Sequence, residues 1–184
     1  MKRLALLCGA LLLFAGIASA QGESPKVEVF GGYSFLRASD SGASANFNGA
    51  SGSVAYNLSP WLGLVSDVGG YHWSQAGNDA TVVSYLFGPK FAYRHGPVTP
   101  FAQVLFGGAH LSGSANNCVF GGGTCTGSSE AFAMALGGGM DWNATPHIGI
   151  RLAQVEYLMT KFNDVSGNDR QNNVRVSTGV VFRW

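Results

Sequence analysis

The sequence predicts an all-β protein, folded as an eight-stranded antiparallel up-and-down transmembrane β-barrel. Three observations lead to this fold class: a terminal segment with a two-residue hydrophobic period, a series of strand-like segments joined by alternately short and long connections, and a composition low in charge. A two-residue period places apolar side chains on one face of a strand and polar side chains on the other. Such strands fit a barrel with an apolar outer surface.

The last eleven residues, VRVSTGVVFRW, show the two-residue period most clearly. One face of this segment holds Val174, Val176, Thr178, Val180, Phe182 and Trp184. The other face holds Arg175, Ser177, Gly179, Val181 and Arg183. A row of valines and aromatics opposite two arginines indicates a strand whose outer row faces an apolar phase.

Eight segments have strand-like patterns, at about 26–37, 47–58, 61–73, 82–94, 100–112, 131–142, 147–160 and 173–184. The connections at 57–60, 95–99 and 143–146 are short and rich in turn residues. The connections at 38–46, 74–81, 113–130 and 161–172 are longer and rich in Gly, Ser, Asn and Asp. Short and long connections alternate strictly, which is typical of membrane barrels with turns at one end and loops at the other.

Charged residues make up 11% of the chain, against about 25% in typical soluble domains. Without Lys2 and Arg3, which belong to a predicted signal peptide, nine basic residues would face ten acidic ones, for a net charge of −1. This balance argues against a nucleic-acid partner, which normally requires a basic patch. The sequence has no phosphate-binding loop, no HExxH and no Cys/His pattern, so we expect no cofactor and no metal.

The N-terminus has the pattern of a secretory signal peptide. Lys2 and Arg3 precede an apolar run at 4–17, and a small-x-small cleavage site follows at 18–20. We therefore expect a cleaved signal peptide at 1–20 and a single domain at 21–184. No second stretch in that domain is long and apolar enough for a membrane helix, so any membrane crossing must use strands.

Cys118 and Cys125 remain after cleavage, six residues apart. In an exported protein the default interpretation is a disulfide. It would close a small ring in the Gly-rich segment 121–123 and add about 2 kcal/mol of stability.

The alternation of the strands predicts a charged interior. The predicted inward-pointing set is Glu28, Asp67, Lys90, Arg94, Asp141, Arg151, Arg175 and Arg183. An eight-stranded barrel has room only for side chains, so these charges should pair across the lumen, with Glu28 as the first candidate partner for Arg175 and Arg183. The alternative is a narrow small-solute pore. The seventh segment does not alternate cleanly: its period turns Gln154 and Glu156 toward lipid unless a bulge near Ala153 or emergence of that end resolves the conflict.

Tryptophans mark both ends of the predicted strands. Trp61, Trp142 and Trp184 fall at the short-turn end, and Trp73, with Tyr71 nearby, falls at the long-loop end. Two aromatic belts are what two membrane interfaces require.

The signal peptide, the strand pattern, the stretch YLFGPKFAYRHGPVTPFAQVLFGGAH at 85–110 and the aromatic C-terminus resemble the OmpA-like eight-stranded outer-membrane β-barrel family. The resemblance covers essentially the whole predicted mature chain. It implies a bacterial outer-membrane location with periplasmic termini, and contact with outer-membrane lipids and lipopolysaccharide. It also implies that Phe182 and Trp184 form an assembly signal for the barrel-assembly machinery. The implied roles are structural integrity, adhesion to an external protein or surface ligand through the loops, or porin-like solute passage.

One enzymatic alternative remains, a lipid A-modifying barrel. His110 and Ser112 form an H-x-S pair on one strand face, similar to outer-membrane lipid A deacylases, and Glu130 is the candidate orienting acid. The favoured interpretation is that the chain is not an enzyme. A non-membrane alternative is a periplasmic barrel that binds a small apolar ligand, which would need an apolar interior in place of the predicted charged one.

Overall fold

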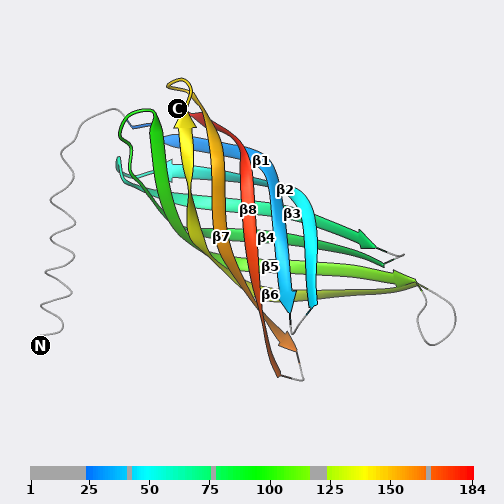
Figure 1. Cartoon of the computed structure of the whole chain (residues 1–184). Coiled ribbons are helices and arrows are strands. Elements are labelled where there is room, and N and C mark those ends of the chain that lie inside the picture. Colours follow the sequence, from blue (N-terminus) through cyan, green and yellow to red (C-terminus); the bar gives the residue numbers. More distant parts are fainter. Residues whose placement is uncertain (1–23, 41–42, 76–77, 117–123, 165–166) are drawn as a thin grey trace, which may run out of the picture.

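The computed structural model describes residues 24–40, 43–75, 78–116, 124–164 and 167–184. These residues form a closed antiparallel barrel in which each strand is hydrogen-bonded to its neighbours in sequence (Figure 1). The eight strands are β1 Val27–Asp40, β2 Ala43–Asn57, β3 Leu62–Gln75, β4 Asn78–Ala92, β5 Val98–Asn116, β6 Thr124–Asn143, β7 Ile148–Asp164 and β8 Gly167–Arg183. None of the described residues forms a helix long and apolar enough to span a membrane. The all-β, eight-stranded fold class is therefore confirmed.

The first and last strands close the barrel. β1 pairs with β8 from Glu28 opposite Arg183 to Ser39 opposite Asn172. The backbone N–H of Val27 donates to the carbonyl of Trp184 at 3.0 Å, and that of Trp184 donates back at 2.9 Å. A closed barrel leaves no sheet edge unpaired, which is the condition for placing strands in a membrane.

The end that holds Val27 and Trp184 also holds three short turns, and we call it the turn end. Ser59 and Thr145 each accept a hydrogen bond through their hydroxyls from the backbone N–H three residues later, which stabilises the turns after β2 and β6. Gly96 has a φ of 74° in the turn after β4, a conformation that favours glycine. These turns lie where the sequence predicted short connections.

The opposite end, which we call the hairpin end, differs from the prediction. The strands continue through most of the segments that were expected to be loops, and β5 and β6 stay paired from Val98–Trp142 to Asn116–Thr124. The sequence predicts that each strand ends where its row of apolar outward residues stops. Backbone pairing does not require that row, so the strands continue as long paired hairpins at this end (Figure 1).

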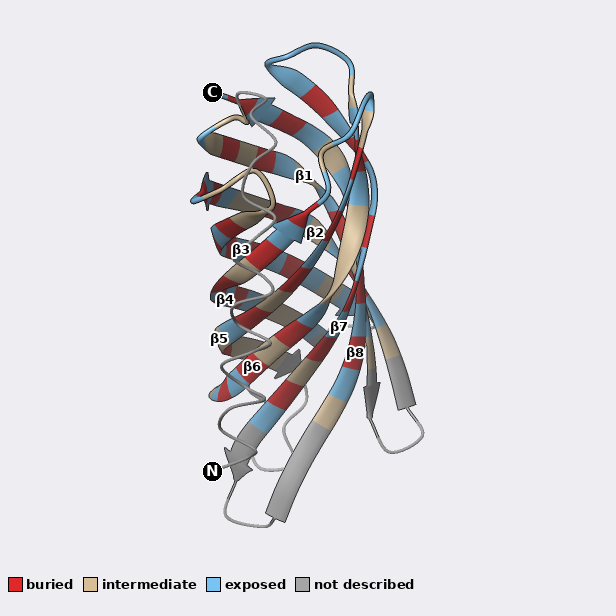
Figure 2. Ribbon diagram, turned by 90° about the vertical axis from the view of Figure 1, so that its left-hand side faces the viewer, coloured by how far each residue is buried: buried red, intermediate tan, exposed pale blue. Residues whose placement is uncertain are grey.

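Burial alternates along every strand, as the bands of Figure 2 show. The outward set is apolar through the middle of the barrel and includes Val54, Tyr56, Val68, Tyr85, Phe87, Phe132, Leu136, Leu152, Val155, Val176 and Phe182. The buried set combines charged residues with alanine, leucine and aromatic residues. An apolar exterior around a partly polar interior is the arrangement of a lipid-facing barrel.

A β-bulge on β7 resolves the irregular pattern of the seventh segment. Ala153 pairs with Met140 and Arg151 pairs with Asp141, which leaves Leu152 as an extra residue between them. The Thr178 hydroxyl donates to the Arg151 carbonyl at 2.9 Å beside the bulge. As a result Arg151 and Gln154 both face inward, and Glu156 is buried as well. The bulge expected near Ala153 is present.

Most aromatic residues predicted for the outer belts lie on the outer face, including Tyr33 and Tyr85 of the set nearer the hairpin end, but Trp73 and Tyr71 do not. Trp142 and Trp184 are exposed on the outer surface, and Trp61 stacks on Phe91 with ring centroids 6.1 Å apart. Trp73 lies inside the barrel, where it packs near Phe47 at 6.4 Å. Tyr71 is also inside and almost fully buried. The placement of these two residues in an outer belt is wrong, because β3 turns its odd-numbered residues inward.

The position of the bulge predicts different outcomes for two single-residue deletions in β7. Removing Leu152 leaves one outward residue between Arg151 and Gln154, so the strand regains a regular period and should still fold. Removing Val155, which is similarly exposed, makes Gln154 and Glu156 adjacent and forces polar side chains of one half-strand toward lipid. We expect the Leu152 deletion to keep the shift in gel migration between unheated and heated samples, and the Val155 deletion to lose it. Equal behaviour of the two deletions would contradict this register.

Candidate functional site

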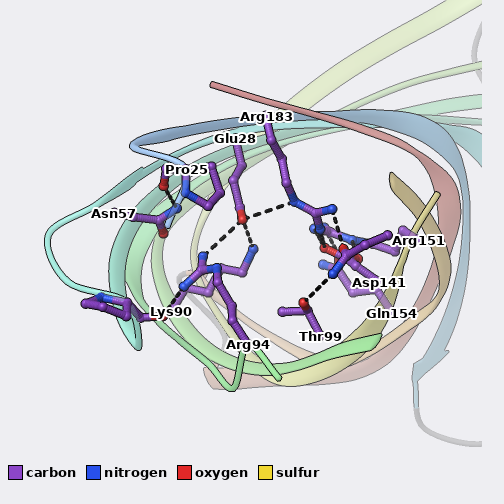
Figure 3. Close-up of polar contacts among 12 residues, drawn as sticks. Pro25, Glu28, Asn57, Lys90, Arg94, Thr99, Asp141, Arg151, Gln154 and Arg183 are labelled. Atoms are coloured by element: carbon purple, nitrogen blue, oxygen red, sulfur yellow. Dashed lines mark hydrogen bonds and ion pairs between the residues drawn. The ribbon is translucent and has the colours of Figure 1, made fainter. Parts of the chain in front are cut away.

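A cluster of charges fills the turn end of the barrel interior. Glu28 of β1 accepts hydrogen bonds from Lys90 at 2.6 Å, Arg94 at 3.0 Å and Arg183 at 3.3 Å. Figure 3 shows the Glu28 carboxylate between these three cations, which come from β4, the segment after β4 and β8. Glu28, Lys90 and Arg183 are all buried. One carboxylate therefore links opposite walls of the barrel.

Arg183 joins this group to a second carboxylate, Asp141. Its Nη2 lies 3.0 Å from Asp141 Oδ2, and Arg151 contacts both oxygens of the same carboxylate at 2.8 and 3.2 Å. Arg151 also donates to Gln154 across the bulge at 2.6 Å. The bidentate pair between Arg151 and Asp141 has the fork geometry that makes arginine–carboxylate contacts strong.

Aromatic rings cover the cations on their apolar side. The Arg151 guanidinium carbon lies 4.2 Å from the Phe30 ring centroid and 4.4 Å from that of Phe101. Lys90 Nζ lies 4.6 Å from the same Phe101 ring. These distances are in the range of cation–π attraction, which is strongest for desolvated cations.

A central cluster crosses the barrel above this layer, towards the hairpin end. Arg175 of β8 is fully buried, at 0% exposure, and its guanidinium contacts Asp67 at 2.7 Å and Glu156 at 2.7 Å. It also donates to the Tyr71 hydroxyl at 3.2 Å. Gln103 donates to the second Glu156 oxygen at 2.8 Å. A Cβ at Gly69 would collide with the Tyr71 ring, so glycine is required beneath that ring.

All eight residues that the sequence assigned to the lumen cluster lie on the inward face of the barrel, and the ion pairs divide them between two layers. The turn-end layer contains Glu28, Lys90, Arg94, Asp141, Arg151 and Arg183, and the central cluster contains Asp67 and Arg175. Glu28 pairs with Arg183, as expected, whereas Arg175 pairs with Asp67 and Glu156. The expected pairing of Glu28 with Arg175 is therefore wrong.

The predicted lumen set leaves out four residues that bond to these two clusters: Tyr71, Gln103, Gln154 and Glu156. For the last two, the sequence offered a bulge near Ala153 only as one way to turn them away from lipid. Two of them follow the bulge on β7, which reverses the face of every later residue on that strand. The unpaired polar residues of the outer row were the available signal, because a carboxylate facing lipid would be costly.

The hairpin half of the interior is apolar, which the sequence did not predict. A cavity of about 440 Å³ lies there. It is lined by Leu36, Ala38, Ala45, Phe47, Trp73, Ala80, Val82, Ala109, Leu111, Leu158, Thr160, Gln171 and Asn173. The expectation of a charged interior thus applies to the turn-end half and the centre of the barrel only.

His110, Ser112 and Glu130 lie on the outer face of the hairpin end. His110 and Glu130 are cross-strand partners on β5 and β6, with Nδ1 and Oε1 3.6 Å apart. Among the described residues, no hydrogen bond joins Ser112 to His110 or to Glu130. Ser112 contributes instead to a polar groove with Asp79, Thr81, Ser114, Thr126 and Ser128.

The predicted disulfide lies partly, and the predicted signal peptide wholly, outside the described residues. Cys118 and residues 1–20 lie outside the described residues, while Cys125 lies near the start of β6. Within the described ranges no group of three or more His, Cys, Asp or Glu residues has the arrangement of a metal site.

Replacing Arg175 tests the central cluster. Arg175→Met leaves two buried carboxylates without their cation, and we expect a loss of about 3–5 kcal/mol in the free energy of unfolding. Arg37→Met, at an exposed arginine on β1, should change it by less than about 0.5 kcal/mol. Urea unfolding in lipid vesicles, followed by tryptophan fluorescence, measures both.

A rescue variant separates charge imbalance from lost packing. Adding Asp67→Asn and Glu156→Gln to Arg175→Met removes the unpaired charges and should recover most of the stability. If Arg175→Met costs no more than Arg37→Met, the central cluster does not carry the stability assigned to it.

The fold has clear relatives among solved structures. The attachment invasion locus protein Ail of Yersinia pestis is 18% identical, with 86% of this chain and 99% of that chain covered and a TM-score of 0.64. Neisserial surface protein A is 17% identical, covering 89% and 100%, with a TM-score of 0.61. The N-terminal barrel of Pseudomonas aeruginosa OprF is 14% identical, covering 88% and 100%, with a TM-score of 0.53. Ail has also been solved in complex with the heparin analogue sucrose octasulfate.

Comparison with curated proteins finds no match. The family model of the outer membrane protein beta-barrel domain matches residues 6–182, nearly the whole chain. The fold, the lipid-facing exterior and the structural relatives agree with that match. The chain therefore belongs to the outer membrane protein beta-barrel domain family and is an outer-membrane β-barrel protein of the type of Ail, Neisserial surface protein A and the OprF barrel.

Proposed function

We propose that this barrel is a non-catalytic protein of the bacterial outer membrane, closed to solutes, which presents its hairpin end to the outside for structural or surface-binding roles. The observation that carries the proposal is the central cluster. Arg175, Asp67 and Glu156 meet across the middle of the interior of an eight-stranded barrel, which is narrow enough for side chains to cross. A barrel blocked at its centre would act through its lipid-facing surface, in a structural role, or through the residues exposed at its ends, in a binding role.

The proposed orientation places the turn end in the periplasm. Short turns at one end and long hairpins at the other are typical of outer-membrane barrels, whose periplasmic turns are the short ones. A cleaved signal peptide at 1–20 would deliver the chain to that compartment. Phe182 and Trp184, stacked with centroids 6.3 Å apart on the outer face of the closing strand, would present the assembly signal to the barrel-assembly machinery.

The hairpin end provides a polar surface for partners outside the cell. Its groove is lined by hydroxyl groups on β4, β5 and β6, with Asp79 as its charged member. Ail binds a heparin analogue, a strongly anionic ligand. Here the described outward charges near that end are mixed, with Arg37 and Lys161 alongside Asp79 and Glu130, so a neutral polar or protein ligand fits better than a polyanion. Lipopolysaccharide would surround this end, and a Cys118–Cys125 disulfide would hold the segment between β5 and β6.

The enzymatic alternative has weak support in the geometry. A serine nucleophile needs a base within hydrogen-bonding distance of its hydroxyl, and the described contacts give Ser112 none. Glu130 is directly opposite His110, but 3.6 Å is too long for the orienting hydrogen bond. The pore alternative needs a continuous polar path, and the Arg175 layer occupies its middle.

Accessibility of tags tests the orientation. An epitope inserted between β5 and β6, within 117–123, should bind antibody on intact cells. The same epitope inserted after Ala144, in the turn between β6 and β7, should bind only after the outer membrane is permeabilised. The reverse pattern would overturn the proposed orientation, and recovery of the protein in the soluble periplasmic fraction would overturn the membrane location.

Conductance tests the closed interior. The purified barrel in a planar bilayer should give no steady channel, because five cations and four carboxylates pair across its interior. A general porin measured in the same bilayer is the control for detection. A reproducible open channel of constant size from the wild-type protein would show that it is a pore.

A further inference from the structure

The cavity in the hairpin half of the barrel is a blind cup. Each of Leu36, Trp73, Val82, Leu158 and Asn173 lines its wall. The inward residue two positions nearer the turn end on each of those five strands is polar, and these residues are Ser34, Tyr71, Ser84, Glu156 and Arg175. The central cluster is therefore its floor. A molecule in the cup has no path onward through the barrel.

The size and lining of the cup suit a small organic ligand. Its volume of about 440 Å³ is in the range of about 300–1,000 Å³ that binding pockets occupy. Phe47, Trp73 and Leu111 supply large apolar surfaces, while Ala38, Ala45 and Ala80 leave the space between them open. Binding pockets of this kind are mostly apolar, with a few polar groups that fix orientation.

One polar group in the wall has an unfilled acceptor. Asn173 is only 4% exposed, and its amide nitrogen donates to Thr160 at 3.4 Å. Its Oδ1 is buried and accepts no hydrogen bond from any residue that the structure describes. A buried acceptor without a donor costs about 1–3 kcal/mol, so a hydroxyl in the cup would relieve this cost once the Asn173 amide turns toward it.

We propose that the cup binds an amphiphile with a long aliphatic body and one hydrogen-bond donor, whose donor group bonds to Asn173 Oδ1 while its chain packs against Phe47, Trp73 and Leu111. The ionic floor excludes apolar chains from the turn-end half and sets the depth of insertion. The same chemistry is available from a lipid of the surrounding membrane or from a free amphiphile outside the cell.

Quenching of Trp73 fluorescence tests this site in barrels reconstituted in lipid nanodiscs. The probe is a terminally brominated long-chain alcohol, and the matching bromoalkane lacks the donor. Subtracting the emission of Trp73→Phe from that of the wild type removes the signal of Trp61, Trp142 and Trp184, which both proteins share. These three tryptophans lie at the turn end, away from the cup. We expect saturable quenching of this difference signal, with the alcohol binding more tightly than the bromoalkane.

Two matched variants decide whether quenching reports the cup. Ala80→Phe fills the cavity and should abolish saturable quenching, while Ala102→Phe adds the same ring to the outer face and should leave it unchanged. If Ala80→Phe fails to fold on gels, Ala45→Leu replaces it. Quenching that persists in a folded, filled variant, or that never saturates in the wild type, would overturn the proposal.

The role of Asn173 has a separate readout. Asn173→Leu keeps a side chain of similar size but removes the acceptor, and should weaken the alcohol about fivefold without changing the bromoalkane. Equal weakening of both probes would exclude recognition of the donor.

Mass spectrometry of amphiphiles that purify with the barrel distinguishes the two sources. A lipid recovered with the wild type but not with Ala80→Phe indicates the membrane, while a wild type that is purified empty and then takes up the probe indicates an external ligand. Both results support the site, and its failure would leave the proposed orientation and closed interior untouched.

Discussion

The hydrogen bonds between β1 and β8 are the constraint on which the rest of the structure depends. In hydrocarbon an unpaired backbone group has no water to bind, so the sheet must return to its own first strand. Closure around eight strands then fixes a narrow interior that side chains can span. Charges such as Glu28 and Arg183 must find partners inside that space, and they do so across the seam.

The interior divides along the barrel axis into two environments. Towards the turn end, carboxylates are shared between cations from several strands, so that β1 is tied to β4 and β6 to β8 across strands that are not hydrogen-bonded neighbours. Towards the hairpin end, alanines and aromatics leave a cavity. The ion pairs of the turn end join residues from opposite sides of the barrel, while the apolar part encloses the cavity. The same barrel therefore combines an ion-paired turn end with a cavity at its hairpin end.

The two-residue period predicted the strands, the turn-end connections and the inward direction of charges such as Lys90 and Arg175. It also located the bulge, because Gln154 and Glu156 conflicted with a lipid-facing row. It did not predict how far the hairpins extend, because a row of apolar residues indicates contact with lipid and does not indicate where backbone pairing stops. The apolar cup was missed for a related reason. Three alanines that line the cup, Ala38, Ala45 and Ala80, lie in segments that the sequence predicted to be loops. The inward direction of Trp73 was missed because β3 does not alternate cleanly in the sequence.

Arg183 stands one residue before the end of the chain, on the strand that closes the barrel. The barrel seam lies between β1 and β8, so the 3.3 Å contact between Arg183 and Glu28 exists only when that seam is closed. Asp141, 3.0 Å from the same guanidinium, is on β6, on the other side of β7. The turn end therefore adds an ion pair to the backbone hydrogen bonds of the seam, and a barrel with an open seam would leave the Glu28 carboxylate with one cation fewer.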